Sequence, residues 1–253
     1  MQTVDLTRGR ELGRGGFGIV YALAQHPDLA VKVSSRNMAT NSCRKWHKEY
    51  QLIRDFMQRI QAAIPNFRFP DDAEIVVPVW VRETEDECSM VMPRILPPDD
   101  SGPTVQAQLG APSVDLVQKA RGRFVGLEQI ERYWQRAGER GDLAKAAFEI
   151  GTLMALLHYV GKNDAYDVEL FLGHQYGDPK LKFFLADFDL SQPIDRYDDE
   201  TIERMVWSLD AVPYFPRPEI DRELYDAFAD GYARIADLNG LGNVAEAVLA
   251  AYE

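Results

Sequence analysis

The sequence has few cysteines and no long apolar run, and both absences exclude classes of protein. Its 253 residues include four histidines and two cysteines, Cys43 and Cys88. Two cysteines cannot form a disulfide framework and are too few for a cysteine-based zinc site, so we expect two small apolar side chains in a reduced compartment. No apolar run approaches about 18 residues, which predicts no membrane span. The polar segment 1–11 predicts no signal peptide, and we expect a cytoplasmic protein.

Positive charge is also in deficit. The chain has 40 Asp and Glu residues against 28 Lys and Arg residues, which gives a net charge of −12. This balance argues against a generally basic surface for DNA, but it is compatible with a local basic patch. Hydrophobic residues make up 46% of the chain, enough to bury a sizeable core.

The order of predicted elements indicates an α+β fold with two lobes. The N-terminal lobe, residues 1–92, combines a helix over 43–60 with predicted strands at 19–23, 29–33, 75–81 and 88–92. Prolines and glycines interrupt residues 93–125, which we interpret as a hinge and inter-lobe loop. Residues 126–253 form a mainly helical lobe, with predicted helices at 142–160, 220–237 and 242–252 and a strand hairpin of 168–172 with 180–186.

A glycine-rich pattern lies near the start of the chain. Gly13, Gly15 and Gly18 fit G-x-G-x-x-G between two predicted strands, as in protein kinases, whereas a dinucleotide fingerprint would lead into a helix. Lys32 follows on the next strand, where kinases place a phosphate-binding lysine. Glu49 lies on the predicted helix, where kinases place the ion-pair partner of that lysine. The ordered set predicts a kinase-like N-terminal lobe.

Acidic residues occupy the segments where kinases have their catalytic loop and D-F-G motif. Asp164 takes the position of the Asp in H-R-D-x-x-x-x-N, and Glu169 takes the position of the Asn, while the His is missing. Asp187 and Asp189 belong to a D-F-D motif. We predict that Asp164, Asp167, Glu169 and Asp187 converge on one cleft.

Carboxylates that share a cleft repel one another and raise each other's pKa values unless a cation joins them. Magnesium is one such cation, because it prefers oxygen ligands together with phosphates. A guanidinium is another, because carboxylates bind it in a bidentate fork. The residues themselves leave both cations open.

Four stretches of the chain resemble one known family. They are 88–98, 156–158 with 164–169, 185–189 and 213–218, and the most specific runs within them read D-x-x-D-V-E and Y-F-P-R-P. The sequence resembles a large fungal family with an uncharacterised domain and a kinase-like fold, which includes arginine-containing cyclodipeptide synthases. The resemblance implies an aminoacyltransferase of secondary metabolism, which closes arginine and a second amino acid, both from charged tRNAs, into a diketopiperazine.

The chemistry of such a synthase suits these residues. The aminoacyl esters are already activated, so no cofactor is required. The carboxylates could bind the guanidinium or act as the general base. Binding of tRNA needs local positive charge, for which the predicted helix and its N-terminal flank offer Arg36, Arg44, Lys45 and Lys48. The same four residues are equally compatible with a solvated helix surface.

Two other classes of function remain open at this point. One is an ATP- and magnesium-dependent phosphotransferase, in which Asp187 and Glu169 would hold the metal. Its predicted substrate- and phosphate-binding residues are Gly13, Gly15, Gly18, Lys32, Glu49 and Asp189. The other is a catalytically silent kinase-like binding module. No A-P-E motif follows the D-F-D motif, which argues against a protein kinase. We prefer the synthase interpretation.

Overall fold

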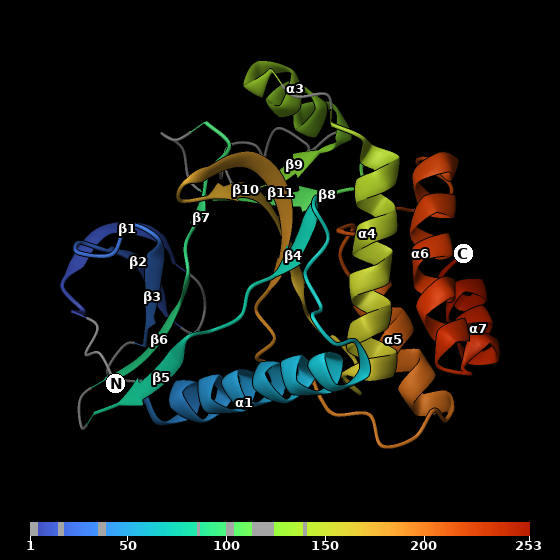
Figure 1. The fold of residues 1–253 in the computed structure, drawn as a ribbon, viewed down its shortest axis with the longest axis horizontal. Helices are drawn as coiled ribbons and strands as arrows, with labels where there is room; N and C mark the ends of the chain where they lie inside the picture. The colour runs from blue at the N-terminus through green and yellow to red at the C-terminus, as the bar shows by residue number, and fades with distance from the viewer. Residues whose placement is uncertain are drawn as a thin grey trace.

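The computed structural model describes residues 5–14, 18–34, 39–84, 87–99, 104–112, 124–138 and 141–253. Figure 1 shows a small sheet at the N-terminal side, a second sheet at the centre and helices on the far side. The predicted α+β class and two-lobed, kinase-like arrangement are confirmed, because a mostly-β lobe with one helix precedes a mainly helical lobe.

The first sheet has five antiparallel strands in the order β1-β2-β3-β6-β5. Their bounds are β1 Arg8–Arg14, β2 Ile19–Leu23, β3 Leu29–Val33, β5 Trp80–Glu83 and β6 Cys88–Pro93. The strands predicted at 19–23, 29–33 and 88–92 are therefore confirmed. They are rich in β-branched and apolar residues, which pack well on a half-buried pleated surface.

Helix α1, Ala39–Ala63, packs against this sheet and extends toward the second lobe (Figure 1). It is longer than the predicted 43–60, and its buried stripe includes Trp46, Ile53, Phe56 and Ile60, each fully buried. The stripe carries one acidic member, Glu49, which is 3% exposed. A carboxylate on an apolar face is costly unless it is paired, so this residue marks a site.

The second sheet corrects two predictions. It joins β4 Ala73–Ile75, β11 Asp178–Ala186, β10 Glu169–Gln175, β8 Val105–Gln108 and β9 Phe124–Gly126, with β7 Ile95–Leu96 pairing with β10. The strand predicted over 75–81 is wrong: Ile75 ends β4, which pairs with β11, and Trp80 begins β5 in the first sheet. Pro78 lies in this break and has no N–H to donate to a ladder.

Residues 93–125 are not simply a loop, because β7 and β8 lie within them and β9 begins there. These strands have two to four residues each, which is too short for an alternating pattern to stand out in the sequence. Their apolar side chains are nevertheless buried, as Val105, Ala107 and Val125 are at most 6% exposed. The inter-lobe segment therefore contributes strands to the second sheet.

The helical lobe contains α3 Leu127–Ala137, α4 Leu143–Ala155 with its π-helical continuation η1 Leu156–Val160, α5 Asp199–Asp210, α6 Arg222–Leu238 and α7 Gly242–Tyr252. Asp142 caps α4, its side chain accepting a hydrogen bond from the Lys145 amide at 2.9 Å. By length and composition, 143–160 could cross a membrane, but 61% of that window is buried inside the protein. It is the central core helix of this lobe.

Helices α4 and α6 lie side by side because glycines let their backbones approach (Figure 1). A Cβ on Gly151 of α4 would lie 2.1 Å from the Phe228 carbonyl oxygen of α6. A Cβ on Gly231 of α6 would lie 2.1 Å from the Phe148 carbonyl oxygen. The packing of this helix pair therefore depends on two positions without side chains.

The two cysteines depart from their predicted state. Cys43 near the start of α1 and Cys88 at the start of β6 form a disulfide, with a Cα–Cα distance of 5.3 Å. The expectation of two separate thiols is wrong, because α1 packs on β6 and brings together residues separated by 45 positions. Both side chains are buried with Trp46 and Met90 in a small apolar cluster.

At the C-terminal end of the α4–η1 segment, His158 is fully buried. Its Nδ1 lies 2.6 Å from the Tyr232 hydroxyl oxygen, which accepts a hydrogen bond from the Tyr159 hydroxyl at 2.9 Å. Burial lowers the pKa of His158 to about 3. The neutral imidazole is therefore the folded form at all ordinary pH values.

This burial predicts that the free energy of unfolding falls as the pH drops below about 6.5. The unfolded chain binds the proton there and the folded chain does not, which costs about 2 kcal/mol between pH 7 and pH 5. Urea unfolding at a series of pH values measures the slope. His158→Gln should be less stable at pH 7 but show a flatter slope, whereas the control His26→Gln should keep the wild-type slope. Equal slopes in all three proteins would contradict the assignment.

Candidate catalytic cleft

A cavity of about 350 Å³ lies between the two sheets. One part is apolar and is lined by Val20 and Ala30 from the first sheet, Met92 from β6, Ile95 from β7 and Phe171 from β10. The other part is polar, and its ionisable lining residues include Lys32, Glu49, Asp167, Glu169, Asp187 and Asp189. The cleft therefore combines an apolar slot with a charged end.

Lys32 on β3 and Asp187 just after β11 form the central ion pair. Lys32 Nζ lies 2.8 Å from Asp187 Oδ1, and the lysine side chain is 12% exposed. Burial alone would lower the pKa of Lys32, but the negative charges of Asp187 and Glu49 outweigh it and raise the pKa. The prediction that Lys32 pairs directly with Glu49 is wrong, because the lysine reaches across the cleft to the D-F-D aspartate instead.

Glu49 lies behind this pair and faces the same motif. Its Oε1 accepts a hydrogen bond from the Phe188 amide at 3.1 Å, while its Oε2 has no hydrogen-bond partner within the described part of the chain. Burial raises the pKa of Glu49, and the charge of Lys32 opposes the rise. The carboxylate thus ties α1 to the D-F-D motif and keeps one oxygen available to a ligand or proton.

Asp167 and Glu169 form the acidic side of the cleft, as predicted. Burial, followed by the charge of Asp187, raises the pKa of Glu169 to about 7, and Gln106 partly offsets this by hydrogen bonding to it. Asp167 has a left-handed backbone with φ of 64°, and its pKa is also raised by burial and by Asp187. These carboxylates lie close enough to interact, and each one disfavours ionisation of the others.

Asp189 is the fifth acidic residue of this end. It is 5% exposed, and burial and the charge of Asp187 raise its pKa against the opposing charges of Lys32 and Lys45. Lys45 Nζ lies 3.8 Å from Asp189 Oδ2. Lys45 was predicted to lie on a tRNA-binding face, but it points toward the cleft.

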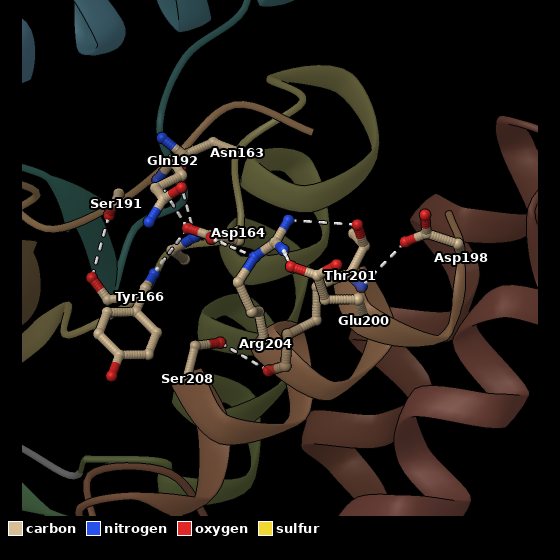
Figure 2. Close-up of polar contacts among 12 residues, drawn as sticks. Asn163, Asp164, Tyr166, Ser191, Gln192, Asp198, Glu200, Thr201, Arg204 and Ser208 are labelled. Atoms are coloured by element: carbon tan, nitrogen blue, oxygen red, sulfur yellow. Dashed lines mark hydrogen bonds and ion pairs between the residues drawn. The ribbon is translucent and has the colours of Figure 1, made fainter. Parts of the chain in front are cut away.

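Asp164 does not line the cleft, which corrects its predicted place. It is fully buried and accepts hydrogen bonds from the Tyr166 amide at 3.2 Å, the Gln192 amide at 2.8 Å and Arg204 Nε at 3.1 Å (Figure 2). The loop turns sharply here, since Ala165 and Asp167 both have positive φ. Asp164 therefore holds the loop to α5. Asp167 lines the cleft in the place that was expected for Asp164.

The remaining predicted residues are placed as follows. Gly13 and Gly18 flank the β1–β2 turn at the cleft, and a Cβ on Gly18 would lie 2.5 Å from the Val33 carbonyl oxygen. Arg44 and Lys48 are exposed on α1. Gly15 and Arg36 fall outside the described residues.

Some residues of the cleft were missed by sequence reasoning. Gln106 lies on β8, in a segment predicted to be a loop, and no sequence pattern marks it. Phe171 and Met92 lie on predicted strands, but which face of a strand meets a ligand becomes clear only once the lobes are assembled. Tyr214, from the Y-F-P-R-P run, is buried beside the acidic end, and its pKa is raised by burial and by the charge of Glu169.

The acidic end could hold a metal ion or an organic cation. Carboxylate oxygens are the ligands that magnesium prefers, and Asp167, Glu169 and Asp187 supply them from one loop and two strand ends. The same oxygens match the donors of a guanidinium. The raised pKa values reflect repulsion among the carboxylates and their burial. A bound cation would lower these pKa values, and the ionised carboxylates would in turn bind the cation more tightly.

Comparison with known proteins adds little to this geometry. No protein-family profile matches the chain, and no curated protein matches it. A crystal structure described as a kinase domain is similar to it, with 13% sequence identity and a TM-score of 0.43 over 83% of this chain. The chain spans 63% of the length of that kinase-domain structure. The kinase-like fold rests on the chain's own arrangement of a β-rich lobe, the helix α1 and a helical lobe.

The Asp164–Arg204 pair predicts a large effect on stability. Arg204→Leu leaves a fully buried carboxylate without its cation and should lower the free energy of unfolding by about 3 kcal/mol. The control Glu200→Gln removes only the surface partner that Arg204 contacts at 3.2 Å, and should cost less than about 1 kcal/mol. Urea unfolding at pH 7 compares the two variants. Similar losses in both would show that Asp164 does not depend on this arginine.

Proposed function

We propose that the chain is a phosphotransferase that binds a magnesium nucleotide in the cleft. The observation that carries the proposal is the Lys32–Asp187 pair at 2.8 Å, which lines the same cavity as Gly13 and Gly18 and has Glu49 behind it. Kinase-like enzymes use a lysine, a helical glutamate and a D-F-G aspartate in these places to bind phosphates and metal. The glycines allow a phosphate to approach the backbone.

Each group of the cleft has a role in this proposal. The apolar slot of Val20, Ala30 and Phe171 would take a planar base. Lys32 would bind phosphate oxygens as a point charge. Glu169 and Asp187 would hold magnesium, which neutralises negative charge on phosphates when bound.

The acceptor hydroxyl would lie near Asp167 in this proposal. This carboxylate lines the cavity. Asp164, which kinases would use at this point, is instead engaged in a buried ion pair with Arg204. Because its pKa is raised, Asp167 is a better proton acceptor than an ordinary surface aspartate. Positioning of the acceptor beside the nucleotide would supply much of the rate.

Nucleotide binding tests the proposal. Isothermal titration with Mg·ATP should show one site, and Lys32→Ala or Asp187→Asn should weaken it at least about tenfold, since each removes a charge that contacts phosphate or metal. Lys48→Ala is the matched control, because this lysine is exposed on the same helix as Glu49. Well-folded wild type that binds no Mg·ATP would overturn the proposal.

A second candidate, the arginine-containing cyclodipeptide synthase, is supported by the composition of the cleft. Among the residues that the structure describes, five carboxylates line it against two cations, Lys32 and Arg14, so the site suits a positively charged substrate group. At its apolar edge Pro93 has no N–H, and the Arg94 amide donates to the Asp28 carbonyl oxygen at 2.9 Å. Position 93 therefore offers no backbone donor to an adenine, and the donor at position 94 is already engaged.

In this second candidate, Glu169 and Asp167 would bind the guanidinium of arginine or deprotonate an α-amine, and no ATP would be consumed. Exposed Arg44 and Lys48 would contact tRNA phosphates. The activity would be that of the fungal family which the sequence resembles.

The reaction product distinguishes the synthase candidate from the phosphotransferase. Expression in bacteria should yield a new arginine-containing cyclic dipeptide by mass spectrometry, and Glu169→Gln should abolish it while Glu200→Gln, on the surface, should not. Synthesis without Mg·ATP binding would replace the phosphotransferase proposal. Absence of both product and nucleotide binding would leave a silent binding module.

A further inference from the structure

Four side chains of types that bind transition metals meet at one end of α1. The Cys43 sulfur, a ring nitrogen of His47 and a carboxylate oxygen of Glu83 all lie within 4.8 Å of one another. Cys88 is bonded to Cys43 and so lies at the same point. This cluster lies outside the residues that line the cleft. Its donors, two sulfurs, an imidazole and a carboxylate, are those that zinc prefers.

The backbone holds the four ligands in two pairs. Cys43 and His47 are four residues apart on α1, so they occupy one face of the helix one turn apart. Glu83 and Cys88 are directly opposite each other on the paired strands β5 and β6. A pair of residues on the helix therefore faces a cross-strand pair on the sheet.

Exposure also suits a metal site. The sulfurs are buried, with Cys43 2% and Cys88 1% exposed, and they lie among apolar side chains that include Trp46 and Met90. His47 and Glu83 are exposed, so they offer a path from solvent to the sulfurs. Such a site is closed on one side by the core and open to ion entry on the other.

We propose that Cys43, His47, Glu83 and Cys88 bind zinc when the disulfide is reduced. A phosphine reductant supplies the two electrons, takes the oxygen of one water molecule to become the phosphine oxide, and leaves that water's two protons on the sulfurs. Zinc then displaces both thiol protons, and four ligands complete a tetrahedral shell with bonds of about 2.0–2.3 Å. In this proposal a histidine and a glutamate complete the ligand set, although the number of cysteines alone predicts no zinc site.

The site has a structural consequence that does not depend on the proposed function. The disulfide and the zinc ion would be alternative crosslinks between α1 and β6 at the same place. Helix α1 carries Glu49 and Lys45, which contact the D-F-D motif. Either crosslink would therefore hold this helix in position in both oxidising and reducing conditions.

Cobalt titration of the full chain, reduced with a phosphine under anaerobic conditions, tests the proposal. One equivalent of Co²⁺ should give thiolate-to-cobalt charge-transfer absorption with the visible bands of a tetrahedral ion, and Zn²⁺ should displace it. His47→Ala and Glu83→Gln should each weaken cobalt binding at least about tenfold, because even indirect partners of a metal site cost that much. The controls His26→Ala and Glu203→Gln should bind as the wild type does.

Three results would overturn the proposal. The first is absence of the charge-transfer absorption in reduced, folded protein. The second is equal cobalt binding by the oxidised protein, whose sulfurs are bonded to each other and cannot act as thiolates. The third is unchanged affinity in both His47→Ala and Glu83→Gln. Because both of these residues are exposed, circular dichroism melts of the variants should match the wild type, which separates loss of a ligand from loss of the fold.

Discussion

The contact between Lys32 and Asp187 is the constraint on which the rest of the site depends. It joins β3 of the first sheet to the end of β11 in the second, and so fixes how the two lobes face each other. Glu49 adds a second link, from α1 to the Phe188 amide beside the same aspartate. Removal of either partner of the Lys32–Asp187 pair would leave a charge in a partly buried place, which is far more costly than loss of a surface pair.

This pair also explains the electrostatics of the cleft. One strong lysine contact is shared among several carboxylates, so burial and mutual repulsion raise the pKa values of Glu169, Asp167 and Asp189. The lining of the cleft therefore favours binding of a positively charged group. Each candidate function supplies one, either magnesium beside phosphates or a guanidinium.

Much of the fold follows from local sequence patterns. Strands β2, β3 and β6 and helices α1, α4, α6 and α7 have clear periodicity, and the spacing of Lys32 and Asp187 placed both in the cleft. Asp164 was misplaced because spacing does not determine the direction of a side chain in a loop with positive φ. The Cys43–Cys88 contact and the short strand with Gln106 arise only from tertiary packing, for which one sequence carries no signal.

Helix α1 connects these features, since it carries Cys43 near its start and Glu49 at its centre and reaches the second lobe at its end. The central claim is that the cleft it borders is a ligand site built around Lys32 and Asp187. A crystal structure with Mg²⁺ and a non-hydrolysable ATP analogue tests this claim most directly. The account predicts phosphates beside Lys32 and the metal ion on Asp187 and Glu169. An analogue bound elsewhere, with Lys32 and Asp187 still paired across an empty cleft, would contradict it.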